Sequence, residues 1–164
     1  MKKEVKVSVI IPTYKPDYYI WECLDSIKKQ TLNKNLVEVL IILNGEKEPY
    51  YNNILNYIKK YRLQNFKLLY TEQNGVSNAR NIGLNNCRGE YIAFIDDDDY
   101  VDENYLEILF QTIQKYGSEG IVLSDHLNFE EVGKNIIRKS DYKLNDYTKN
   151  LVKFRRTFSM IWGK

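Results

Sequence analysis

The chain has 164 residues, of which 43% are apolar and 28% charged; this balance suits one globular domain with a buried core and excludes extended disorder. Its formal net charge of +2 is too small to indicate nucleic-acid binding. No apolar run reaches the roughly 18 residues of a membrane-spanning helix. Cys23 and Cys87 lack the spacing of a metal site or a redox pair. We therefore expect a cytoplasmic protein with reduced thiols and no signal peptide.

Basic residues concentrate near the end of the chain. Between Lys134 and Lys164, nine Lys or Arg residues stand against only Asp141 and Asp146, a local balance of +7. Such a segment can contact an anionic substrate or the inner face of the cell membrane, and it can equally form a solvated surface. Peripheral membrane contact and plain solvation both stay open.

Aliphatic and β-branched runs predict buried strands over residues 5–11, 37–43, 66–70, 91–95 and 121–123. Pro12 is expected to end the first of them. A hairpin is expected around Glu131 to Gly133.

Apolar residues at helical spacing predict helices between and after these strands. Asp17 is expected to cap the first helix, and Ile20, Cys23, Leu24 and Ile27 are expected to lie on its buried side. Asn74 and Gly75 open the third helix, which is predicted to run through Asn86 and carries Val76, Ala79, Ile82 and Gly83. The other helices are predicted over residues 50–61, 104–116 and 146–158. Strands that alternate with helices in this way indicate an α/β fold, a Rossmann-like layer sandwich with a mostly parallel sheet and helices on both faces.

Polar or glycine residues follow each of the first four predicted strands. In an open α/β sheet, ligands bind outside the carboxyl ends of the strands. The residues concerned are Thr13 and Tyr14, Asn44 and Gly45, Asn74 and Gly75, and the run Asp96 to Asp99. The sequence therefore predicts one binding site at this edge of the sheet.

The acidic run follows an apolar strand, where four adjacent carboxylates repel one another unless water or a cation compensates them. Mg²⁺ and Mn²⁺ bind carboxylate oxygens, and Mg²⁺ typically shares them with substrate phosphates. Asp96 and Asp98 are the candidate metal ligands. The alternative is an exposed acidic turn that caps the next helix, and Asp99, Asp102 and Glu103 are expected to have that role.

Two common nucleotide sites are excluded by the residues after the first strand. Pro12 to Pro16 replace the glycine-rich turn of a dinucleotide-binding fold, and no phosphate-binding P-loop occurs in the chain.

Four segments resemble the family 2 glycosyltransferases, which have the GT-A fold. They are Val7 to Tyr14, Cys23 to Ile27 with Gln30 and Thr31, Asn74 to Gly83, and Arg88 to Asp99, which resembles the strand that delivers the DxD metal motif. The likeness runs in order from Val5 to Leu109.

The resemblance implies a role for each matching residue. Pro12, Thr13 and Tyr14 would contact uridine, and Asn44 stands where the family often has an aspartate that hydrogen-bonds uracil. Arg80 would orient the acidic loop, although a surface or helix-packing role is equally open. The remaining implied roles are close backbone approach to the nucleotide at Gly75, ribose or phosphate contact at Asp96 and Asp97, and metal binding at Asp98 with Asp96.

The resemblance also implies two regions, a nucleotide-sugar-binding core over 1–125 and the start of an acceptor-side region over 126–164, where the chain is expected to be truncated. Inverting transfer needs a base within reach of the acceptor hydroxyl. We expect this base beyond Lys164, and Asp125 and His126 are the local substitutes.

The leading hypothesis is metal-assisted, inverting transfer of a sugar from a UDP-sugar donor to a glycan or lipid-linked acceptor in polysaccharide biosynthesis. A non-catalytic nucleotide-sugar-binding fragment is the alternative. A sugar-phosphate nucleotidyltransferase is a third hypothesis, but residues 13–16 lack the glycine-rich loop that it needs.

Overall fold

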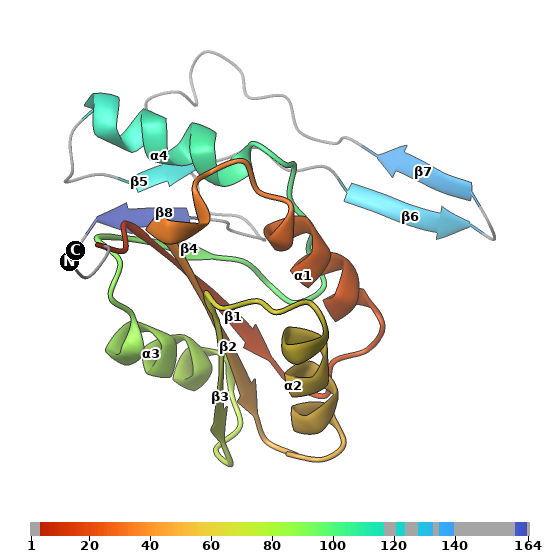
Figure 1. Ribbon diagram of the computed structural model, residues 1–164. Helices are drawn as coiled ribbons and strands as arrows, with labels where there is room; N and C mark the ends of the chain where they lie inside the picture. Colours follow the sequence, from red (N-terminus) through yellow and green to blue (C-terminus); the bar gives the residue numbers. More distant parts are fainter. Residues whose placement is uncertain (1–3, 117–120, 124–127, 133–134, 140–159, 164) are drawn as a thin grey trace.

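The structure is a computed structural model that describes residues 4–116, 121–123, 128–132, 135–139 and 160–163 (Figure 1). Its main sheet has six strands in the order β3-β2-β1-β4-β8-β5. These strands are β1 (Val7–Thr13), β2 (Val37–Asn44), β3 (Phe66–Thr71), β4 (Tyr91–Phe94), β5 (Ile121–Leu123) and β8 (Met160–Gly163). The first four strands are parallel, and β8 runs antiparallel to both β4 and β5. The predicted mostly parallel sheet is confirmed.

The first strand does not end at Pro12, as the sequence predicted, but continues to Thr13. The carbonyl oxygens of Lys6 and Ile10 accept hydrogen bonds from the backbone N–H groups of Tyr91 and Ile95, respectively. The backbone polar groups of every second residue of β1 therefore face β4. The backbone of Pro12 faces the same side, at a level where β4 has already ended. Its missing N–H therefore removes no bond of the ladder.

Helices cover both faces of the sheet, as predicted (Figure 1). Because side chains alternate along a strand, Val9 and Ile11 of β1 pack on one face and Ile10 on the other. The first face is covered by α1 (Tyr19–Lys28), α2 (Tyr50–Lys60) and α4 (Tyr105–Tyr116), and the second by α3 (Val76–Asn86). The apolar residues predicted to face inward on α1 are all buried.

One detail at the helix starts differs from the sequence predictions. Asp17 does not cap α1 from its side chain: the N-cap is Tyr18, and the Asp17 carboxylate accepts a bond from the adjacent Tyr18 N–H. Val76, the first residue of α3, is 48% exposed.

Near the end of the chain, the predicted hairpin is present as β6 (Asn128–Val132) and β7 (Asn135–Lys139), an antiparallel pair separate from the main sheet. The helix predicted over 146–158 lies outside the described residues. No helix in the described ranges is long and apolar enough to cross a membrane.

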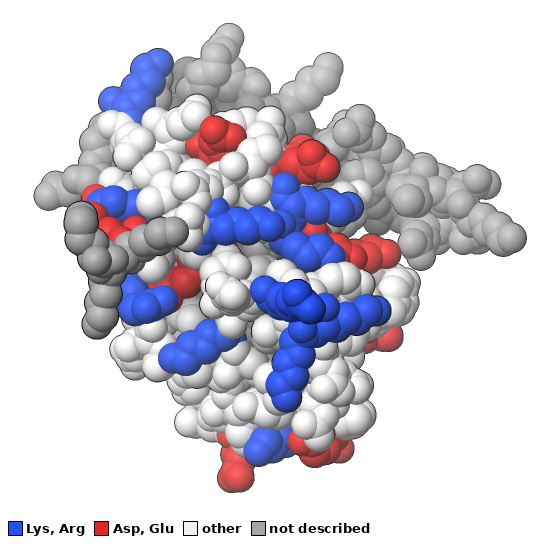
Figure 2. Space-filling model, in the orientation of Figure 1, with Lys and Arg blue, Asp and Glu red and all other residues white. Residues whose placement is uncertain are grey.

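Lys and Arg side chains gather over α1 and α2 on the face that Figure 2 shows. Lys28 lies in the last turn of α1, and Lys59 and Lys60 in the last turn of α2. Because these helices return from the carboxyl edge of the sheet to its amino edge, the basic residues lie at the edge opposite the acidic run. Cations at helix carboxyl ends are favourable for the helix dipole, which is sufficient reason for their position.

Candidate functional site

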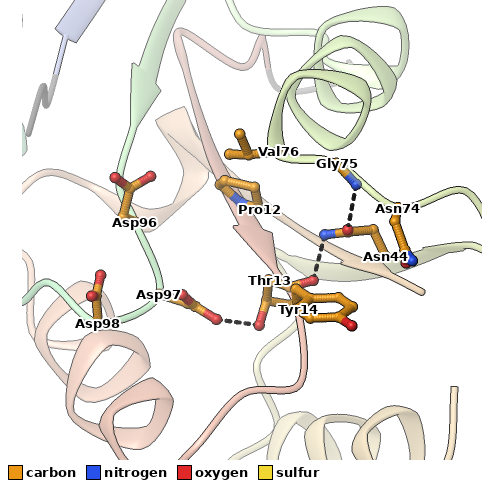
Figure 3. A pocket seen from close by; sticks show the side chains of 10 residues that line it. All are labelled: Pro12, Thr13, Tyr14, Asn44, Asn74, Gly75, Val76, Asp96, Asp97 and Asp98. Carbon is orange, nitrogen blue, oxygen red and sulfur yellow. Dashed lines mark hydrogen bonds between the residues drawn. The ribbon is translucent and has the colours of Figure 1, made fainter. Parts of the chain in front are cut away.

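A cleft of about 490 Å³ opens at the carboxyl ends of β1, β2 and β4, beside the first turn of α3 (Figure 3). It is lined by Pro12, Thr13, Tyr14, Asn44, Asn74, Gly75, Val76, Asp96, Asp97 and Asp98. Parallel strands with right-handed crossovers bring their carboxyl ends to one edge, so residues from four distant parts of the sequence meet here.

A chain of hydrogen bonds joins these segments from one side of the cleft to the other (Figure 3). The backbone N–H of Gly75 donates to Asn44 Oδ1 at 3.0 Å. Asn44 Nδ2 donates to the Thr13 carbonyl oxygen at 2.7 Å. The Thr13 hydroxyl in turn donates to Asp97 Oδ2. The start of α3, the ends of β2 and β1, and the acidic loop are thus held in a fixed relation.

A glycine is required where β2 turns away from the cleft. Gly45 has a φ of +87°, in the region that side chains rarely adopt. A Cβ at this position would lie 2.2 Å from Asn74 Oδ1 and 2.7 Å from a ring carbon of Tyr14. The missing side chain therefore makes room for Asn74 and for the Tyr14 ring, which is 51% exposed.

The three acidic side chains of the cleft differ in their partners. Asp96 Oδ1 accepts a charged hydrogen bond of 2.7 Å from Arg80 Nη2. Asp97 is bound to the Thr13 hydroxyl. Asp98 is exposed, and within the described residues its carboxylate has no hydrogen bond or ion pair. Of the three, Asp98 has the carboxylate available to a ligand.

Burial raises the pKa of the Asp97 carboxyl above its ordinary value; the Thr13 hydrogen bond opposes this rise, and the charge of Asp98 adds to it. Burial likewise raises the pKa of the Cys23 thiol, which lies 3.5 Å from the Asp96 carbonyl oxygen. Cys23 is therefore a protonated packing residue that supports the acidic loop from α1.

Helix α1 also anchors the chain that follows the acidic run. Ser26 Oγ accepts a bond from the Val101 N–H at 3.2 Å. The buried Gln30 side chain donates to the Asp102 carbonyl at 2.7 Å and accepts from the Leu106 N–H at 2.8 Å. These bonds hold Gln30, one of the residues in the segments that carry the family resemblance, beside the acidic loop.

Of the predicted site residues, all line the cleft except Arg80, which reaches it through Asp96. Arg80 is thereby neither a surface residue nor only a packing residue, and its Nε is buried without a partner among the described residues. Asn74 also lines the cleft, as the polar residues after the strands predicted, although no particular contact was predicted for it. Val76 lines the cleft too and was not a predicted site residue.

Two sequence predictions are not addressed by this geometry. Asp125 and His126 lie outside the described residues. Among the residues that are described, no group of three or more His, Cys, Asp or Glu side chains is gathered to hold a metal ion. A metal at Asp98 would need oxygen ligands from elsewhere, such as substrate phosphates, which Mg²⁺ sites commonly use.

Two glycosyltransferases are similar in sequence to most of this chain. The glycosyltransferase GlyA of Streptococcus pneumoniae is 35% identical over 77% of this chain and 17% of its own. The poly(ribitol-phosphate) beta-N-acetylglucosaminyltransferase TarS of Staphylococcus aureus is 32% identical over 73% of this chain and 21% of its own. This chain thus spans about a fifth of the length of these relatives.

Solved structures show the same fold. TarS 1–349 in complex with UDP-GlcNAc superposes with a TM-score of 0.60 at 33% identity, over 68% of this chain and 32% of that one. The mannosyltransferase PcManGT of Pyrobaculum calidifontis superposes with a TM-score of 0.65 at 23% identity, over 71% of this chain and 34% of that one. The GT-A fold expected from the sequence is confirmed.

The model of the family described as "Glycosyl transferase family 2" matches residues 8–163, nearly the whole chain. The matched range includes every strand of the sheet except the first residue of β1, together with the ten described residues that line the cleft. The chain belongs to glycosyl transferase family 2.

Proposed function

We propose that the chain is the donor-binding part of a glycosyltransferase, which holds a UDP-sugar for inverting, metal-assisted transfer to a glycan or lipid-linked acceptor. The observation that carries the proposal is the cleft itself. A chain of hydrogen bonds orders the side formed by Thr13, Asn44 and Gly75, and the Asp98 carboxylate, which has no partner among the described residues, lies on the acidic side.

The charge of the cleft supports a divalent cation. Among the described residues, its lining contains three aspartates and no Lys or Arg, so a diphosphate would meet a like charge. Asp98 would hold Mg²⁺ or Mn²⁺. Asp96, the second predicted ligand, also forms an ion pair with Arg80. Such a cation stabilises the negative charge on a departing diphosphate. Family 2 glycosyltransferases often use a divalent metal.

The chain's own residues would position the donor around that charge. The exposed Tyr14 ring offers an apolar surface for a base, and Gly75 lets the backbone approach the nucleotide closely. Arg80 would keep the Asp96 carboxylate in place. TarS, solved with UDP and with UDP-GlcNAc at about 33% identity, supports uridine as the base.

Calorimetric titration of UDP, with and without Mn²⁺, tests this proposal on wild type and on Asp98→Ala. We expect UDP binding that strengthens with Mn²⁺ in the wild type and loses this dependence in the variant. UDP binding that ignores both the metal and the substitution would refute the site.

A second candidate is a nucleotide-sugar-binding fragment without transfer activity. One observation favours it: among the described residues, the acidic side chains of the cleft are those of the Asp96 to Asp98 run, and no later residue lines it to act as the base. We propose that the base belongs to the acceptor-side region and lies beyond Lys164. A turnover assay with UDP-sugars decides between the two: we expect UDP binding but no transfer by these 164 residues, and rapid transfer would contradict this placement of the base.

The proposed location is the cytoplasm, with the basic segment 134–164 at the inner face of the membrane. Most of that segment lies outside the described residues, so the membrane contact stays a prediction.

A further inference from the structure

Helix α1 contacts the acidic loop on both sides of the Asp98 carboxylate. Before it, the Cys23 thiol lies 3.5 Å from the Asp96 carbonyl oxygen. After it, Ser26 Oγ accepts a hydrogen bond of 3.2 Å from the Val101 N–H. The metal candidate Asp98 therefore lies in a short segment between two points that α1 holds.

Gln30, which follows the end of α1, extends this support to the next helix. Only 7% of Gln30 is exposed, and its carboxamide uses both ends. Nε2 donates to the Asp102 carbonyl at 2.7 Å and to the Ser26 carbonyl at 3.2 Å. Oε1 accepts at 2.8 Å from the N–H of Leu106, the second residue of α4, where the first N–H groups lack a partner within the helix. One side chain thus holds the segment that joins the acidic run to α4.

Gln30 is not among the described residues that line the cleft. Its effect on a ligand is therefore indirect, through the position of the acidic loop. A carboxylate that is already in place binds a cation more tightly than one that must be ordered on binding, because the ordering costs conformational entropy. Losing a group that supports a metal ligand typically weakens metal binding by about 10–100-fold.

We infer that Gln30 is a positioning residue for Asp98: its carboxamide holds the segment after the acidic run and so sets how strongly a divalent cation aids nucleotide binding. The inference rests on the proposed function, because it needs a cation at Asp98. Gln30 itself touches neither the cation nor the nucleotide.

Calorimetric titration of UDP, with and without Mn²⁺, tests the inference on wild type, Gln30→Met and Gln30→Asn. Methionine has a similar size but makes neither bond, and asparagine keeps the amide on a side chain too short to reach both partners. We expect the gain in UDP affinity from Mn²⁺ to fall about tenfold in both variants. UDP affinity without metal should stay at the wild-type level.

The matched control is Ser8→Ala. Ser8 is also a buried polar residue, but it lies at the amino edge of the sheet, where it bonds to Glu38 and Gly89. Thermal denaturation should show that the control and the Gln30 variants are all less stable than wild type, yet the control should keep the full gain from Mn²⁺. Gln30 variants that keep this gain, or a control that loses as much of it, would overturn the inference.

Amide hydrogen exchange of Leu106 gives a readout that needs neither nucleotide nor metal. In wild type this N–H is bonded to Gln30 and should exchange slowly, and Gln30→Met should exchange it faster. Fast exchange in wild type, or equal exchange in the two proteins, would show that the bond does not form and would overturn the inference. Wild type that binds UDP with no gain from Mn²⁺ would refute the metal-assisted proposal and the inference with it. A gain that the Gln30 variants retain would refute the inference alone.

Discussion

At the scale of single residues, the cleft depends on charges that are paired in specific ways. Arg80 contacts the acidic run through its 2.7 Å bond to Asp96. Its guanidinium carbon also lies 5.8 Å from the centre of the Phe94 ring, which holds it against β4. One side chain thus joins α3 to the loop that follows β4.

We expect Arg80→Met to weaken UDP binding in the presence of Mn²⁺ by about tenfold, because Asp96 then adds an unpaired charge near the diphosphate. Calorimetric titration measures the change. The matched control is Arg62→Met, since Arg62 is exposed beyond the end of α2. Equal affinity in Arg80→Met and wild type would mean that the ion pair does not contribute to the donor site.

Glu38 is a buried carboxylate at the amino edge of the sheet, far along β2 from the cleft. Burial opposes its ionisation, but hydrogen bonds from Ser8 and Arg88, together with the charge of Arg88, outweigh burial and lower its pKa. Because the folded pKa is lowered, the stabilisation is complete above the ordinary value of 4.5 and is lost as the pH falls through the folded value.

Glu38→Gln should therefore reduce the free energy of unfolding at pH 7 by about 1–3 kcal/mol. The difference from wild type should shrink as the pH falls below 4.5. Urea denaturation at several pH values tests this, with the exposed Glu72→Gln as control. A constant difference at all pH values would show that the ionised form of Glu38 is not what stabilises the fold.

At the scale of elements, α3 lies close against β1 because a glycine faces the strand. A Cβ at Gly83 would lie 2.5 Å from the Cγ2 atom of Ile10, which is fully buried. This close packing sets the distance of α3 from the sheet, and so the place of Gly75 at its start.

We expect Gly83→Ala to destabilise the protein by about 1–3 kcal/mol through overpacking, although alanine favours a helix by about 1 kcal/mol over glycine. The measurement is urea denaturation, and Ser77→Ala, at an exposed position of the same helix, is the control. A stabilised Gly83→Ala would show that α3 can move away from Ile10 at little cost.

At the scale of the whole molecule, the last described strand belongs to the main sheet. β8 pairs with β4 through Tyr91 to Ala93 and with β5 through Ile121 to Leu123, so it separates these two strands. Residues at the end of the chain therefore complete the sheet formed by the first 125 residues.

A chain that ends at residue 159 should be less stable than the full chain, because β4 then has an unpaired edge and β5 loses its partner. Thermal denaturation of the two chains tests this, and light scattering should detect more association in the shorter one. Equal melting temperatures would mean that β8 contributes nothing to the sheet.

The sequence alone determined those features that depend on local patterns. Runs of aliphatic residues predicted the strands β1 to β5, and helical spacing predicted α1 to α4, because burial of an apolar face determines both. The polar residues after the strands predicted the site, since parallel strands place their carboxyl ends at one edge.

Only the tertiary structure decided which groups meet. The place of Pro12 within β1 depends on where the neighbouring strand ends, and the exposure of Val76 depends on which side of α3 meets the sheet. The hydrogen bonds of Asn44 and the Arg80–Asp96 pair join residues that are 31 and 16 positions apart. β8 pairs with strands far earlier in the chain. Such contacts follow from the packing of the whole chain, which no local spacing of residues records.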